Sequence, residues 1–97
     1  MPSVVYYRGG NSLKPTRLDV CYDRVSGLLR TTRGVSLADR PDGLDRFGGA
    51  YRVNGIPDTL KVVQIGRDRH HFEIVPAQPM TFAEYETALR QIALTRV

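Results

Sequence analysis

Four polar residues, far apart in the chain, are of the types that act on phosphates and sugars. Arg8 follows an apolar run, Ser36 lies in the segment RGVSL, and His71 and Glu73 lie in the segment HFE. A guanidinium offers a planar fork of donors to phosphate or carboxylate, and a small hydroxyl beside a glycine can orient a ligand. A carboxylate in a cleft can stabilise a developing sugar cation. Together they indicate a site for an anionic ligand that contains a sugar.

Each of these residues also has an ordinary structural interpretation. Arg8 and Ser36 can be strand-end residues that face solvent. His71 and Glu73 are two apart, so on a strand they point to the same face. That face is either the wall of a cleft or a solvent-facing surface with Phe72 turned inward.

The element expected to hold the histidine and the glutamate is a β-hairpin within residues 58–80. Two apolar, β-prone runs at 60–65 and 72–75 flank a basic, turn-like loop at 66–70. This arrangement predicts a hairpin or two neighbouring strands.

Further short strands are expected at residues 3–7, 17–22, 28–32 and 50–53. Arg8 would lie at the C-terminal edge of the first, and residues 26–27 would form a turn. Around Ser36, alternation predicts Val35 and Leu37 inward and Ser36 outward. These elements would bring Arg8 and Ser36 onto the same sheet as the hairpin.

Two other segments have clear signals. Residues 39–49, DRPDGLDRFGG, are rich in turn residues and predict a loop or lid with one helical turn at 44–47. Thr81 and Glu84 fit a capping box that begins a helix over residues 82–93. Its apolar stripe consists of Phe82, Tyr85, Leu89 and Ile92.

This pattern predicts a single domain, residues 1–97, of the α+β class. It has five to seven short strands and one C-terminal helix, and few helical segments separate the strands. The sheet should therefore be mainly antiparallel.

Composition narrows the function classes. The formal charge of +4 and pI near 9.6 favour an anionic partner. No apolar run is long enough for a membrane span, and the N-terminus lacks a Sec-type pattern, so we expect folding in the cytoplasm. Cys21 alone cannot form an internal disulfide and is expected to be a small buried hydrophobe. His70 and His71 lack partners at metal spacing, so no metal site is predicted.

Several segments resemble the ADP-ribosyltransferase-like Tse toxin family, which comprises type VI secretion effectors and related toxin–antitoxin toxins. The order Arg, Ser, Glu resembles the R-S-E arrangement of ADP-ribosyltransferases. The matching segments are VVYYR at 4–8, GVSLAD at 34–39, IPDTLKV at 56–62, and HFEIVPAQPM at 71–80. The last is the most specific. The resemblance implies a mainly antiparallel split sheet with a C-terminal helix, in a minimal toxin core.

The resemblance also implies a function and a site. The protein would be a bacterial toxin that binds NAD in the cytoplasm and transfers or releases ADP-ribose, neutralised by a cognate antitoxin or immunity protein. Arg8, Ser36, His71 and Glu73 would be catalytic, and NAD would contact Tyr7, Arg8, Ser36, Phe47 and Phe72. Two positions depart from the family: Val35 replaces a hydroxyl residue, and a Thr can stand where Glu73 lies. Either His71 or Glu73 could therefore carry the catalytic role.

Two alternatives remain open. The basic residues, with Arg40, Arg67 and Arg69 the most prominent, fit a non-catalytic toxin or binding module that acts on nucleic acid. They form no basic run and no aromatic platform. The chain could also be a protein-interaction domain whose partner is an antitoxin.

Overall fold

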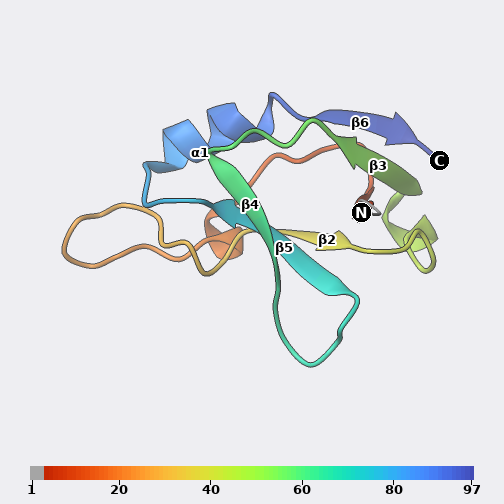
Figure 1. Ribbon diagram of the computed structural model, residues 1–97, viewed down its shortest axis with the longest axis horizontal. Coiled ribbons are helices and arrows are strands. Elements are labelled where there is room, and N and C mark those ends of the chain that lie inside the picture. The colour runs from red at the N-terminus through yellow and green to blue at the C-terminus, as the bar shows by residue number, and fades with distance from the viewer. Residues whose placement is uncertain (1–3) are drawn as a thin grey trace.

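The computed structural model describes residues 4–97 as an α+β fold built on one six-stranded antiparallel sheet. In chain order the strands are β1 (Tyr7–Gly9), β2 (Val35–Ala38), β3 (Ala50–Asn54), β4 (Leu60–Gln64), β5 (His71–Pro76) and β6 (Ala93–Arg96). Their order in the sheet is β4-β5-β2-β1-β3-β6. Figure 1 shows the loop of the β4–β5 hairpin projecting from the rest of the fold. One α-helix, α1 (Phe82–Leu89), lies between β5 and β6. The predicted α+β class and antiparallel sheet are confirmed.

The predicted central hairpin is formed by β4 and β5. Its register pairs Leu60 with Pro76 and Gln64 with Phe72. β5 lies between β4 and β2, and it packs its apolar side chains into the core, with Ile74 fully buried. The expected alternation around Ser36 is also confirmed, because Val35 and Leu37 are buried and Ser36 is exposed.

The sheet narrows at its centre. β1 joins β2 through a single residue pair, Tyr7 with Ala38, whereas β2 pairs with β5 at four positions. The sheet is continuous but consists of two three-stranded parts, β4-β5-β2 and β1-β3-β6, that meet at this pair. The strands β1 and β2 are therefore free to diverge beyond it.

Helix α1 is attached to the β4-β5-β2 part of the sheet by Tyr85. The predicted capping box begins it: the Thr81 hydroxyl accepts from the Glu84 N–H at 3.1 Å, and Glu84 accepts from the Thr81 N–H at 3.0 Å. The fully buried Tyr85 hydroxyl donates to the Ile74 carbonyl and accepts from the Val35 N–H. It thus links β5 to β2.

Gly34 allows this close packing at the start of β2. A Cβ at this position would lie 1.8 Å from the Ile74 carbonyl oxygen and 2.6 Å from the Tyr85 hydroxyl. Any side chain here would separate the two strands at the point where the helix is attached.

The N-terminal third differs most from the sequence expectations. Residues 17–22 are not a strand: Arg17–Asp19 form a short 3-10 helix, because the Asp19 carboxylate accepts from the Thr16 N–H at 2.7 Å and closes a turn. The strand expected at 28–32 is reduced to isolated bridges of Leu29 with Tyr22 and Met80. Cys21 is half-buried rather than buried.

Two element boundaries also differ. The first strand begins at Tyr7, so Arg8 is its middle residue; Ser3, expected in that strand, lies outside the described residues. The helix ends at Leu89 rather than residue 93, and β6 follows and pairs with β3. Ile92 still lies in the core, as its place in the apolar stripe predicted. Within residues 4–97, no helix is long and apolar enough to span a membrane.

Candidate functional site

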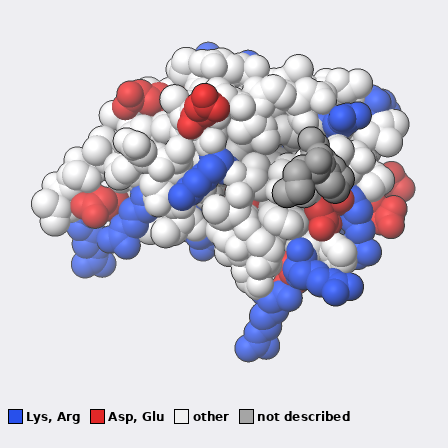
Figure 2. Space-filling model, viewed as in Figure 1, with Lys and Arg blue, Asp and Glu red and all other residues white. Residues whose placement is uncertain are grey.

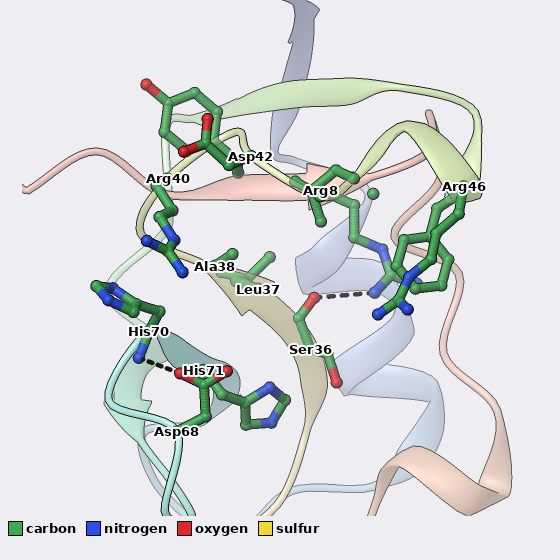
Figure 3. A pocket seen from close by; sticks show the side chains of 15 residues that line it. Arg8, Ser36, Leu37, Ala38, Arg40, Asp42, Arg46, Asp68, His70 and His71 are labelled. Carbon is green, nitrogen blue, oxygen red and sulfur yellow. Dashed lines mark hydrogen bonds between the residues drawn. The ribbon is translucent and has the colours of Figure 1, made fainter.

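A cleft of about 460 Å³ opens where β1 and β2 diverge. Its walls come from β1, β2, the loop between β2 and β3, and the end of the β4–β5 hairpin. Five residues singled out from the sequence line it: Tyr7, Arg8, Ser36, Phe47 and His71. In Figure 3, Arg8, Ser36 and Arg46 lie to one side of the view, and His70, His71 and Asp68 lie to the other. The volume falls in the range of small-ligand sites, about 300–1,000 Å³.

Arg8 bridges the gap between the diverging strands. Its Nη1 donates to the Ser36 carbonyl at 2.9 Å (Figure 3). Its Nε donates to the Ser12 carbonyl at 3.0 Å. Burial lowers the pKa of Arg8 from its usual value, and the nearby Asp19 opposes that shift. A guanidinium stays protonated even so. Arg8 is therefore a fixed, half-buried positive charge at the edge of the cleft.

Ser36, Ala38, His71 and Glu73 share one face of the sheet. The register pairs Ser36 with Glu73 and Ala38 with His71, and directly paired residues point the same way. Tyr7 pairs with Ala38 and extends the same row across the narrow junction. The polar face of the hairpin is thus a cleft wall at His71.

Glu73 lies behind this wall rather than in the cleft. It is only 4 % exposed and is absent from the lining. Its Oε1 accepts from the Gly34 N–H at 2.9 Å and from Arg33 Nε at 3.3 Å, and its Oε2 lies 3.0 Å from His71 Nε2. The glutamate is thus fully engaged by protein groups, and His71 is the member of the pair that lines the cleft.

The Phe47 ring packs directly against the backbone of β1 at Gly9, where the missing side chain leaves room for it. A Cβ on Gly9 would lie 2.8 Å from the Phe47 ring, so only glycine permits this contact. The Arg46 guanidinium lies 4.8 Å from the centre of the Phe47 ring, within cation–π range. Phe47 remains 53 % exposed and lines the cleft, so one aromatic surface is available to a ligand.

The loop that carries Phe47 is joined to the hairpin just beyond the end of the β2–β5 pairing. His70 Nδ1 lies 2.8 Å from the Asp39 carboxylate, and the Asp39 N–H donates to the His70 carbonyl at 3.4 Å. Gln64 donates to the Gly66 and Asp68 carbonyls, which stiffens the hairpin tip. Residues 39–49 therefore form a docked loop with a 3-10 helix at Asp45–Phe47, close to the helical turn that the sequence predicts.

Phe72, expected to contact the cofactor, lies outside the cleft lining. Because side chains alternate along a strand, it points away from the face of His71 and Glu73. It packs edge-to-face against Tyr6, with ring centroids 5.1 Å apart. Phe72 is a core-facing residue in this fold.

Five charged or titratable residues of the cleft were not assigned to it from the sequence: Arg40, Asp42, Arg46, Asp68 and His70. Four of them belong to the loop at 39–49 or its hairpin contact. The sequence indicated a lid at residues 39–49. The composition of a loop, however, does not show which of its side chains point into a cleft.

Comparison with known proteins adds no relative. No family model matches the chain, and neither a curated protein nor a solved structure shows significant similarity to it.

Proposed function

We propose that this protein is a bacterial toxin that binds NAD in the cleft between β1 and β2 and transfers or releases ADP-ribose. One observation carries the proposal: Tyr7, Arg8, Ser36, Phe47 and His71, distant in the sequence, line a single cleft. All of these residues except Phe47 lie in segments that resemble the ADP-ribosyltransferase-like Tse toxins. The narrow junction between two three-stranded parts of the sheet is also what a split sheet would require.

The charges of the cleft suit a dinucleotide. Arg8, Arg40 and Arg46 line it, against the carboxylates of Asp42 and Asp68. Two N–H groups of Arg8 are used by backbone carbonyls, so its remaining donors and the exposed Arg40 and Arg46 would contact the pyrophosphate. The Phe47 ring offers a stacking surface for the nicotinamide or adenine ring.

The chemistry proposed for the cleft is cleavage of the bond between nicotinamide and ribose. Ser36 would orient the amide or a ribose hydroxyl. His71 would act at the ribose as the oxocarbenium-like transition state forms. The docked loop at residues 39–49 would keep water from the reacting atoms.

The test is growth inhibition with measured NAD. Wild type and the variants Arg8→Ala, Ser36→Ala and His71→Ala are expressed under tight control in bacteria, and colony counts and cellular NAD are followed. Wild type should arrest growth and deplete NAD, and His71→Ala should do neither. Exposed positions outside the cleft provide matched controls, Arg24→Ala and Thr87→Ala, which should remain as toxic as wild type.

Folding must be checked for each variant by circular dichroism. If well-folded cleft variants all inhibit growth as strongly as wild type, the site assignment fails. If wild type arrests growth with NAD unchanged and binds nucleic acid with a steep salt dependence, the alternative of a basic nucleic-acid-binding toxin replaces this proposal. The cognate antitoxin or immunity protein would be recognised by co-expression that restores growth.

A further inference from the structure

We infer that His71 presents its Nδ1 atom to the cleft as a general base, and that Glu73 is a positioning residue that fixes this tautomer. The catalytic half of the inference rests on the proposed function. The tautomer itself does not, because an NMR spectrum reports it without any enzymatic activity.

The hydrogen bonds of Glu73 determine which nitrogen of His71 carries the proton. An ionised carboxylate accepts hydrogen bonds and donates none. Oε1 already accepts from Gly34 and Arg33, and Oε2 faces His71 Nε2 at 3.0 Å. The proton in that last contact therefore belongs to Nε2. A neutral imidazole protonated at Nε2 has its lone pair on Nδ1.

His71 is more exposed than Glu73 and reaches the cleft. Its side chain is 35 % exposed and lines the cleft, whereas the Glu73 side chain is 5 % exposed. Within residues 4–97, the imidazole forms its hydrogen bond through Nε2, and Nδ1 has no protein partner. A base aimed at the cleft and held from behind by a carboxylate is the arrangement that activates a nucleophile in hydrolase triads.

The carboxylate is itself held rigidly. Its anchors are a backbone N–H and a guanidinium, both on the segment that leads into β2, while Glu73 lies in the middle of β5. A Cβ on Gly34 would lie 1.8 Å from the Ile74 carbonyl oxygen, so this backbone N–H lies in close contact with β5. The orientation of His71 is thus determined by β5 and by the segment that leads into β2.

In the reaction assigned to this pair, an oxygen nucleophile displaces nicotinamide from the ribose. Nδ1 of His71 takes the proton of a water molecule or of an acceptor hydroxyl. The oxygen of that group forms a bond to C1′ of the nicotinamide ribose. The C1′–N1 bond breaks, and its electron pair enters the pyridinium ring, which leaves as neutral nicotinamide. The imidazolium then donates to Glu73 from Nε2, and the carboxylate stabilises its charge.

Glu73→Gln tests the positioning role directly. The glutamine carbonyl must accept from Gly34 and Arg33, so its amide N–H would face His71. Nε2 must then accept, and the ring proton moves to Nδ1. The matched control is Glu86→Gln, a half-buried glutamate on α1 outside the cleft.

The first measurement is the ring-nitrogen NMR spectrum of His71 at about pH 8, where an ordinary imidazole is neutral. Wild type and Glu86→Gln should show the Nε2–H tautomer, and Glu73→Gln should show Nδ1–H. A wild-type spectrum with the proton on Nδ1 overturns the inference. The test therefore remains decisive even if the Glu73→Gln protein fails to fold.

The second measurement is steady-state NAD consumption by the purified protein. Glu73→Gln should lower kcat roughly 100- to 10,000-fold, the range seen for a wrong-tautomer histidine and for lost general-base catalysis, with KM for NAD nearly unchanged. If Glu73→Gln has the Nδ1–H tautomer and its kcat is still within threefold of wild type, the inference is overturned. Wild type that consumes no NAD, with or without acceptor proteins from a bacterial lysate, instead rejects the proposed function and leaves the NMR result to decide the tautomer.

Discussion

Arg8 serves the fold and the cleft with different parts of one side chain. Its Nη1 donates to the Ser36 carbonyl on β2, and its Nε donates to the Ser12 carbonyl in the segment after β1. The same side chain lines the cleft. An arginine is required for this because a lysine has a single ammonium and cannot span two carbonyls in a fixed plane.

Arg8→Lys should therefore destabilise the protein as well as weaken ligand binding. Losing one or both hydrogen bonds of a half-buried guanidinium should lower the free energy of unfolding by about 1–2 kcal/mol. Urea denaturation measures this. Arg24→Lys, at an exposed loop position, should change stability by less than about 0.5 kcal/mol. Equal stabilities for wild type and Arg8→Lys would show that the bridge contributes nothing to the junction.

At the scale of elements, the attachment of α1 holds the two strands behind the cleft in register. The Tyr85 hydroxyl contacts β2 at Val35 and β5 at Ile74, one residue from Ser36 and Glu73 respectively. Gly34 leaves room for it. The position of His71 relative to Ser36 thus depends on a tyrosine that does not line the cleft.

This attachment predicts a loss of stability at alkaline pH. Burial raises the pKa of Tyr85 to about 12, above the value near 10 of an exposed tyrosine. Because the folded-state pKa is the higher one, the stabilisation is complete below about pH 10 and is lost as the pH rises towards about 12. Its upper bound is about 3 kcal/mol.

The measurement is urea denaturation of wild type and Tyr85→Phe at several pH values. Tyr85→Phe leaves the Val35 N–H and the Ile74 carbonyl without their partner and should cost about 1–3 kcal/mol at neutral pH. Its stability should also fall less steeply between about pH 10 and 12. The half-exposed Tyr51 supplies the control Tyr51→Phe, which should retain the wild-type pH dependence. Parallel curves for wild type and Tyr85→Phe would contradict the account.

The strongest sequence signals were those that local chemistry decides. The capping box at Thr81 and Glu84, the alternation around Ser36 and the β4–β5 hairpin all follow from neighbouring residues, and all three are present. The 3-10 helix at Arg17–Asp19 was missed because an apolar alternation concealed the Asp19 turn. β6 was missed because only its pairing with β3 makes Ala93–Arg96 a strand.

The site was predictable in part for the same reason. Residue types and order indicated Arg8, Ser36, His71 and Glu73. Burial then places His71 in the cleft lining and Glu73 behind it, and no local pattern reports burial. The glutamate contacts Gly34 and Arg33, about forty positions away in the chain. Likewise, the loop at residues 39–49, which carries charged residues of the cleft, is joined to the hairpin by the long-range contact of Asp39 with His70.

At the scale of the whole molecule, charge alone does not identify the partner. On the face shown in Figure 2, acidic side chains lie among basic ones, although basic side chains project at the lower end, where the hairpin tip carries the exposed Arg67 and Arg69. The recognition surface that we propose is instead the cleft, where the two parts of the sheet meet.

The central claim is that this cleft binds NAD, and it is tested most directly by an NMR titration of isotope-labelled protein with NAD. Saturable shifts should concentrate on Tyr7, Ser36, Phe47 and His71, and Phe47→Ala should weaken binding while preserving the fold. Leu94 on β6, which lines a different pocket, is the control and should not shift. No saturable shifts at millimolar NAD, or shifts confined to residues away from β1 and β2, would contradict the account.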